Sequence, residues 1–420
     1  MTLENLISTV NFYTAVIFAV CFAYQLIYLL VPVFLKTKPH KETVLHRYAV
    51  LISARNEEAV ITHLLSSIND QTYPSELVTA FVVADNCTDQ TARLAEEAGA
   101  VVYERFNNQQ VGKGYALDFL TEKIKEDYGA DYFDGFFVFD ADNLLDRNYI
   151  EEMNKTFSDG YNIITSYRNS KNYGDNWISA GYALWFLREA MYLNRSRMLI
   201  GSSCAVSGTG FLFSSEILKK CGGWKFFLLT EDIEFTVYNI IRGEKIGFCE
   251  KAMLYDEQPV TVRQSWRQRL RWSRGFLQVF GKYGRELLRG IFTFKGFSYY
   301  DITMTIMPAF VLTVFSAVFN ISMSFYGAFA KGDILIAAGS LVQFMINSYW
   351  LMFLMGAVTT ITEWDHIHTT TAKKIFYTFT FPVFMFTYIP ISMQALFTKV
   401  EWTPIEHNVS ISIDQLEHSA

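Results

Sequence analysis

Long stretches without a charged residue divide the chain. No Asp, Glu, Lys or Arg lies between Glu4 and Lys36, and three further gaps of this kind follow Asp301. Each gap exceeds the roughly 20 apolar residues that cross a bilayer core. Buried core helices of that length without one charge are rare. We therefore expect membrane segments at about 11–35, 302–330, 334–362 and 375–398.

The last of these segments differs from the others, because Pro382 and Pro390 interrupt it. Proline inside a helix removes a backbone hydrogen bond and kinks or breaks the helix. Four full spans would also leave both chain ends on one side of the membrane, opposite the central domain. If the C-terminal tail lies beside that domain, residues 375–398 form an interfacial or re-entrant helix.

The region between the first two segments has the pattern of a soluble α/β domain. Short apolar runs alternate with amphipathic segments, which predicts parallel strands joined by helices. The predicted strands are 48–53, 81–85, 101–105 and 136–142, and the predicted helices are 57–70, 88–98 and 114–128. Three of the four strands end in acidic or polar residues. Ligands of such sheets bind beyond the carboxyl ends of the strands.

Composition excludes several classes of protein. Hydrophobic residues make up 51% of the chain, aromatic residues 16% and charged residues 19%, which is the opposite of a disordered chain. The formal net charge of −6 disfavours a nucleic-acid partner. The five cysteines form no close pairs, so we expect neither a zinc site nor a disulfide framework.

Flanking charges predict the orientation of the first segment. Lys36, Lys38, Lys41 and Arg47 follow it, whereas only Glu4 precedes it. Because basic residues stay on the cytoplasmic side, we expect an integral plasma membrane protein with its large domain in the cytoplasm. The predicted parts are a membrane anchor with a basic stretch (1–47), the large α/β domain (48–262), interfacial helices (263–298), a membrane region (299–398) and a tail (399–420).

A basic and aromatic stretch precedes the second membrane segment. Residues 263–289 contain eight basic residues, one acid and interleaved Trp, Phe and Tyr. This pattern is typical of an interfacial helix on anionic lipid. An RNA-binding surface is the other interpretation of such a pattern, and the neighbouring membrane segment disfavours it.

Three acidic motifs carry candidate chemistry. Asp140 and Asp142 leave a predicted strand two residues apart, so they either hold Mg²⁺ or Mn²⁺ together with substrate phosphates or cap a helix. Asp85 follows another strand and is equally ambiguous. Thr230, Glu231 and Asp232 begin a helix, either as a cap or with a carboxylate acting as a general base.

The order of these motifs resembles a known family. ARNEE, ADNCTD, GKGYAL, DADN, SGTGF, TED and QRLRW follow one another before the C-terminal membrane segments. This series is similar to the membrane-integrated family 2 glycosyltransferases, which include the processive synthases of cellulose, chitin, hyaluronan and poly-N-acetylglucosamine. The resemblance covers about residues 48–275 by motif and the whole chain by layout.

The resemblance implies a fold and a set of roles. The fold is an α/β GT-A (nucleotide-diphospho-sugar transferase) domain with α-helical transmembrane segments. Asp232 is implied as the catalytic base, with Glu231 and Thr230 beside it, and Asp142 and Asp140 as metal ligands. The implied donor-binding residues are Ala54, Arg55, Glu57, Asp85, Lys113, Asp140, Gln268 and Arg271. The implied acceptor-binding residues are Ser207, Gly208, Thr209, Gly210 and Trp272.

The function implied is an inverting, processive β-glycosyltransferase that uses Mg²⁺ or Mn²⁺. It would transfer sugar from a UDP-sugar, GlcNAc or Glc, to a growing polysaccharide and secrete the polymer through its helices in the bilayer, with a small membrane accessory subunit as a further partner. The alternative is a non-processive transferase with a lipid acceptor. Residues 401–407 are similar in position to a gating segment of some relatives, and a juxtamembrane anchor is the other interpretation.

Overall fold

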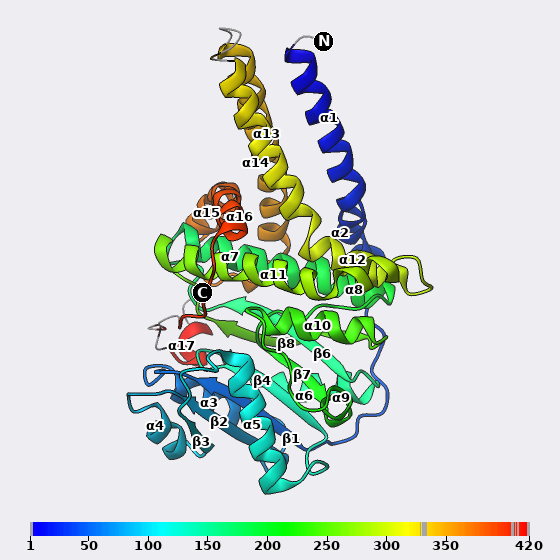
Figure 1. Ribbon diagram of the computed structural model, residues 1–420. Coiled ribbons are helices and arrows are strands. Elements are labelled where there is room, and N and C mark those ends of the chain that lie inside the picture. The colour runs from blue at the N-terminus through cyan, green and yellow to red at the C-terminus, as the bar shows by residue number, and fades with distance from the viewer. Residues whose placement is uncertain are drawn as a thin grey trace.

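The computed structural model describes residues 3–327, 329, 334–404, 407, 409 and 411–417. Figure 1 shows three layers: a sheet domain, a layer of helices lying across it, and long helices that project from that layer. The tail returns from the helical layer to the sheet domain, so residues far apart in the sequence meet there.

In the described part of the chain, eight strands form one sheet in the order β3-β2-β1-β4-β7-β6-β8-β5. The strands are β1 (Tyr48–Ala54), β2 (Val78–Asp85), β3 (Val101–Arg105), β4 (Gly135–Asp140), β5 (Leu144–Leu145), β6 (Ile163–Ser170), β7 (Phe211–Ser214) and β8 (Ile246–Asp256). The first four are parallel, as the sequence predicts. The sheet becomes mixed at β7, which is antiparallel to β4 and β6.

Helices cover both faces of this sheet. They are α3 (Ile61–Asn69), α4 (Thr91–Glu97), α5 (Lys113–Tyr128), α6 (Tyr149–Ser158), α9 (Ser215–Cys221) and α10 (Glu231–Ile241). Alternate residues of β1 enter two separate apolar cores, Ala49 and Leu51 on one face and Val50 and Ile52 on the other. Burial on both faces explains why β1 reads as one continuous apolar run.

The helical layer contains α7 (Trp177–Arg188), a π-helical turn at Glu189–Asn194, α8 (Arg195–Ile200), α11 (Val262–Gly290) and α12 (Gly296–Ile306). The single long helix α11 coincides with the basic and aromatic stretch of the sequence. It runs between the sheet domain and the projecting helices (Figure 1).

The projecting helices are α1 (Leu3–Phe22), α2 (Tyr24–Phe34), α13 (Pro308–Tyr326) and α14 (Ile334–Thr362). Within the residues that the structure describes, three helices are long and apolar enough to cross a membrane: Asn5–Phe34, Val342–Thr362 and Thr371–Phe397. The apolar helix Val314–Tyr326 is shorter there. These helices make membrane association a property of the fold.

The helices α15 (Thr371–Phe386) and α16 (Tyr388–Phe397) run along the helical layer instead of projecting from it (Figure 1). Lys373 Nζ donates to the Gly174 carbonyl oxygen at 2.7 Å near the start of α15. Arg269 Nη1 donates to Thr387 Oγ1 at 2.6 Å, and Arg274 Nη1 to the Ala395 carbonyl oxygen at 3.2 Å. These contacts hold the segment against the helical layer.

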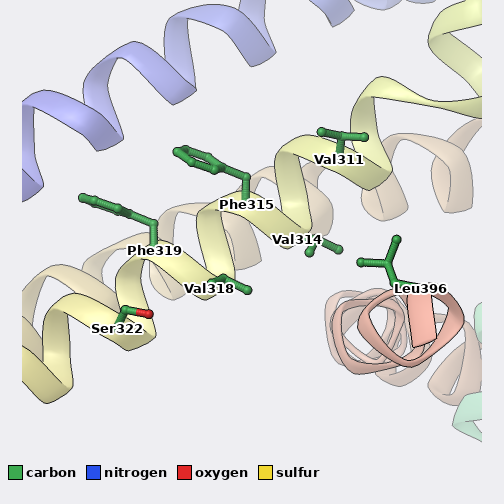
Figure 2. Close-up of a pocket in the computed structure, with 7 residues that line it drawn as sticks. All are labelled: Val311, Val314, Phe315, Val318, Phe319, Ser322 and Leu396. Carbon is green, nitrogen blue, oxygen red and sulfur yellow. The ribbon is translucent and has the colours of Figure 1, made fainter. Parts of the chain in front are cut away.

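An apolar groove lies between α13 and α16. Its volume is about 550 Å³, and Ser322 is the polar residue among those that line it. Figure 2 shows Leu396 of α16 next to the side chains that α13 turns toward it. The lining residues are Val311, Val314, Phe315, Val318, Phe319, Ser322 and Leu396.

A buried ion pair joins the helical layer to the N-terminal helices. The Arg197 guanidinium binds both carboxylate oxygens of Asp301 at 2.7 Å, and the two side chains are 2% and 1% exposed. The hydroxyls of Tyr24 and Tyr28 donate to the same carboxylate at 2.9 and 2.6 Å. One carboxylate thus holds α2, α8 and α12 together.

We expect Asp301→Asn to destabilise the protein by about 3–5 kcal/mol, because it leaves the Arg197 charge buried without its counter-ion. The melting temperature of the full chain in detergent measures this effect. Glu216→Gln, which breaks an exposed pair with Lys220 on one helix, is the control and should leave the melting temperature unchanged. Equal effects of the two variants would contradict the prediction.

Candidate active site

The carboxyl ends of three parallel strands bring the predicted donor residues together. Ala54 ends β1, Asp85 ends β2 and Asp140 ends β4, and the register pairs Ser53 with Asp140 across the sheet. The edge formed by these strand ends is the place where open α/β sheets bind ligands. The order of the strands therefore explains why residues from 54 to 140 meet at one site.

Asp85 is fixed by a buried partner. Arg105, the last residue of β3, donates to Asp85 Oδ1 at 2.6 Å, and both side chains are 6% exposed. The same guanidinium also donates to the Gln110 carbonyl oxygen at 2.8 Å. The carboxylate predicted to contact the donor is thus held in one orientation by the neighbouring strand.

The two acids of the D-x-D motif have different surroundings. Asp140 is 36% exposed and pairs at 2.6 Å with Lys113, at the start of α5. Asp142 is buried, and its Oδ2 accepts from the Glu257 backbone N–H at 2.7 Å. Burial raises the pKa of Asp142, but the charges of His407 and Lys171 and the Glu257 N–H outweigh it and lower the pKa overall. Asp142 is therefore ionised at neutral pH.

These two carboxylates suit a hard divalent cation, since Mg²⁺ and Mn²⁺ prefer oxygen ligands. In the described ranges, no group of three or more His, Cys, Asp or Glu residues is gathered closely enough to hold a metal ion. A cation here would need further oxygen ligands, as from a bound diphosphate or water.

The loop 207–210 connects the site's parts. Gly208, with φ of 75°, donates its N–H to Asp232 Oδ2 at 2.7 Å, and its carbonyl oxygen accepts from Lys113 Nζ at 2.9 Å. Thr209 Oγ1 accepts from the Asp140 N–H at 2.9 Å. Gly210 faces inward, where a Cβ would lie 1.8 Å from Leu254.

The start of α10 presents two acids to this loop, the buried Glu231 and the half-buried Asp232. Thr230 precedes the helix but makes no side-chain cap, and among described residues its hydroxyl has no hydrogen-bond partner. Burial and the neighbouring Asp232 raise the pKa of Glu231 to about 7. Burial also raises the pKa of Asp232, against the opposing effects of backbone N–H groups, Lys113 and Arg271. The pair therefore binds protons more tightly than ordinary acids.

Residues of α11 lie on the side of the site that faces the helical layer. The charge of Arg271 acts on both acids of α10, and the Trp272 indole lies edge-on to the rings of Tyr182 and Phe186 at 5.7 and 6.2 Å. The Gln268 Oε1 atom is buried and has no hydrogen-bond partner among the described residues.

The C-terminal tail lies against the donor edge. The Trp402 ring is 5.5 Å from the Arg55 guanidinium carbon, and His407 Nδ1 is 3.0 Å from Glu57 Oε2. Burial lowers the pKa of His407, but nearby carboxylates, first Asp142 and then Glu57, raise it to about 10 overall. Further along, Ile413 and Leu416 pack with Leu144 and Tyr255. Residues 405 and 406 of the segment 401–407 lie outside the described residues.

The sequence analysis missed an ion pair behind the site. Arg168 of β6 donates through Nε to Asp256 Oδ2 of β8 at 2.7 Å, and burial raises the pKa of Asp256 to about 6. Glu189, which accepts from Ser207 Oγ at 3.2 Å, was also missed. The run Tyr255-Asp256-Glu257 after an apolar stretch was a usable signal, since it repeats the pattern of the other strand ends.

Glu231→Gln should stabilise the protein at pH 8 but not at pH 4.5. The raised pKa means that the folded state binds the proton more tightly than the unfolded state, so this group makes stability fall as pH rises from about 4.5 to about 7. Each pKa unit corresponds to about 1.4 kcal/mol, and glutamine removes the effect. Melting temperatures at both pH values check this, with Glu126→Gln on the exposed surface as control. A lower melting temperature of Glu231→Gln at pH 8 would show that the ionised carboxylate is favoured.

Comparisons with known proteins agree with this architecture. The model of the family described as glycosyltransferase-like family 2 matches residues 46–275. The probable glycosyltransferase YdaM of Bacillus subtilis is 26% identical over 67% of this chain and 69% of its own length. The β-monoglucosyldiacylglycerol synthase of Synechocystis is 24% identical over 56% of this chain, and the poly-β-1,6-N-acetyl-D-glucosamine synthase of Staphylococcus epidermidis is 25% identical over 59%.

The chain spans 49% and 60% of the length of the latter two relatives. A solved structure of the mannosyltransferase PcManGT from Pyrobaculum calidifontis, in complex with GDP-mannose and Mn²⁺, is similar in fold. It covers 94% of this chain and 99% of its own, with a TM-score of 0.59 and 15% identity. The family match covers more than half of the chain and includes every element that forms the donor edge. This protein therefore belongs to glycosyltransferase-like family 2 and is a membrane-associated glycosyltransferase with the GT-A fold.

Proposed function

We propose that the chain is an inverting, processive β-glycosyltransferase that transfers sugar from a UDP-sugar to the end of a growing polysaccharide. The observation that carries this proposal is the bond between Asp232 and the Gly208 N–H. The bond holds a half-buried carboxylate of raised pKa next to Gly208, which also binds Lys113, the partner of Asp140, and the charge of Arg271 acts on that carboxylate. This arrangement suits a proton-accepting group between a donor site and an acceptor site.

The donor site is formed by the strand ends. Asp85 and Arg55 are assigned to the nucleoside, and Lys113 and Arg271 to the diphosphate. Asp140 and Asp142 would hold Mg²⁺ or Mn²⁺ with the diphosphate oxygens, and a cation bound there supplies positive charge that stabilises the leaving group. The similar mannosyltransferase structure contains Mn²⁺ together with a nucleotide sugar, which supports this assignment.

Asp232 is assigned to proton removal. It takes the proton of the acceptor hydroxyl as that oxygen bonds to the anomeric carbon, while the bond from that carbon to the diphosphate breaks. Attack opposite the leaving group inverts an α-linked donor to a β-linked product. On this assignment, the positive charges of Lys113 and Arg271 would stabilise the negative charge that develops on the leaving diphosphate, which is the electrostatic support that such a step needs.

The helical layer and the tail support processive synthesis at a membrane. The indole of Trp272 is assigned to the acceptor sugar, because the apolar faces of sugars stack on indole rings. The tail contacts Arg55 and Glu57 at the donor edge, so we assign residues 401–407 to gating of the donor site. The basic residues after the first segment favour a cytoplasmic catalytic domain.

A lipid acceptor is the second candidate. The apolar groove between α13 and α16 (Figure 2) would suit an acyl chain, and the similar β-monoglucosyldiacylglycerol synthases bear the name of a lipid product. In that case transfer stops after one sugar, Asp232 keeps its role, and Trp272 has no acceptor sugar to stack on.

One assay distinguishes these functions. Membranes containing the full chain are incubated with radiolabelled UDP-glucose, UDP-N-acetylglucosamine or GDP-mannose and with Mg²⁺ or Mn²⁺. Labelled polymer that is retained in a gel supports the proposal, and label extracted into organic solvent supports the lipid alternative. Transfer from GDP-mannose alone, or no transfer from any donor, would overturn the UDP-sugar proposal.

Asp232→Asn should reduce sugar transfer by about 10²–10⁴-fold, the usual contribution of a general base. UDP affinity should stay within a few-fold of the wild type, because the assigned donor residues are unchanged. Calorimetry with UDP and Mn²⁺ measures binding on the preparation used for turnover. A collapse of UDP affinity would place Asp232 in the donor site.

Trp272→Ala should impair chain elongation more than hydrolysis of the UDP-sugar. The lost aromatic contact is worth about 0.5–1.5 kcal/mol beyond its buried area, and it acts on the acceptor, which hydrolysis does not need. UDP release and polymer length are measured together on one folded preparation. Equal losses of both would show that the indole serves the packing around Tyr182 and Phe186.

A further inference from the structure

A π-helical turn lies in the helical layer next to the loop 207–210. Helix α7 continues into α8 through Glu189–Asn194, where the backbone adopts the wider π form. Such turns are rare, and many occur at functional sites. The turn begins at Glu189, whose side chain is partly exposed to a cleft behind residue 207.

This cleft is small and polar. It has room for about 10 Å³, close to the space of one water molecule or one hydroxyl group. Arg168, Glu189, Ser207 and Thr209 are among the residues that line it, and Phe186 supplies an apolar wall. A whole sugar ring does not fit there, but one hydroxyl group of a ring at its mouth does.

Glu189 has unused hydrogen-bonding capacity in this cleft. Its Oε2 atom accepts from Ser207 Oγ at 3.2 Å, and among the described residues no hydrogen bond reaches Oε1. Arg168 is already engaged, because it binds Asp256, donates to the Ser207 carbonyl oxygen at 3.1 Å and lies 3.7 Å from the centre of the Phe186 ring. The cleft therefore offers a carboxylate oxygen as an acceptor.

The contacts of Glu189 connect it with the assigned base, Asp232, and with the assigned stacking residue, Trp272. Ser207, its partner, is followed by Gly208, whose N–H binds Asp232. Phe186 lies three residues earlier on the same helix, hence on the same face, and its ring contacts the Trp272 indole. Glu189 thus lies between the assigned base and the assigned stacking residue.

We propose that Glu189 is a specificity-determining residue of the acceptor site, which accepts a hydrogen bond from a hydroxyl of the acceptor sugar next to the attacking one. A bond of a hydroxyl to a carboxylate is stronger than one to a neutral acceptor, and it would fix the ring on Trp272 with its attacking hydroxyl toward Asp232. This inference rests on the proposed function and deepens it.

The test uses the full chain in nanodiscs with the UDP-sugar that the wild type uses. The free monosaccharide of the same sugar and its single-deoxy analogues serve as added acceptors. Glu189→Gln and Glu189→Ala are compared with the wild type for acceptor KM, kcat, UDP release without acceptor, UDP affinity and melting temperature. Glu250→Gln is the matched control, because it removes a carboxylate that pairs with Arg195 further along the same helical segment.

We expect Glu189→Ala to raise the acceptor KM about 10- to 100-fold, as loss of a charge-assisted hydrogen bond does. Glu189→Gln should have a smaller effect, since the amide keeps an oxygen acceptor. UDP release and UDP affinity should stay within about threefold of the wild type, and Glu250→Gln should change nothing. One deoxy analogue should be a poor acceptor for the wild type but no poorer than its parent sugar for Glu189→Ala.

Two results would overturn the inference while leaving the proposed function intact. One is an equal loss of hydrolysis and transfer with a lower melting temperature, which would make Glu189 a scaffold residue. The other is that the wild type and Glu189→Ala discriminate equally against every deoxy analogue. If the wild type transfers no sugar from any donor, the proposed function fails and this inference fails with it.

Discussion

Hydrogen bonds to the backbone of Gly208 join the two halves of the catalytic domain, in addition to the pairing of β4 with β7. The Gly208 carbonyl oxygen accepts a hydrogen bond from Lys113, and the Gly208 N–H donates one to Asp232. Lys113 also pairs with Asp140. The parallel half of the sheet ends in Asp140, and the mixed half carries the loop of Gly208. These bonds fix the separation of Asp140 from Asp232, and the rate of a transfer reaction depends on the positions of the reacting atoms. A side chain at 208 would be strained, since its φ of 75° favours glycine.

The site concentrates acids at a cost to stability. Glu231, Asp232 and Glu234 occupy the first turn of α10, where the helix dipole favours negative charge. The helix dipole does not fully offset the energetic cost of burying these carboxylates, because the pKa values of Glu231 and Asp232 stay raised. Residues that serve chemistry in this way commonly lower the stability of a fold.

The sequence predicts the first half of the domain well and the second half poorly. The runs that form β1, β4 and the second half of β2 are buried on both faces, so their apolar residues are continuous and easy to recognise. Strand β7 has only four residues, and β6 and β8 change register between Ser166 and Tyr167. None of these three strands has a clear alternation of apolar and polar residues, so Arg168 and Asp256 were not recognised as neighbours of the site. The contact of Glu57 with His407 joins residues 350 positions apart, and periodicity carries no information about such pairs.

Helix α11 shows how the membrane side and the active site are coupled. Gln268, Arg271, Trp272 and Gly275 are spaced so that they share one face of the helix, and Gly275 lies against Thr230 at the start of α10. Trp266, Leu270, Arg274 and Leu277 share the opposite face, and there they contact α16 and the start of the tail. The Q-x-x-R-W residues thus form one face of α11, and the residues that contact α16 form the other. Because side chains fill both faces, a shift of α15 and α16 would move Arg271 and Trp272 relative to Asp232.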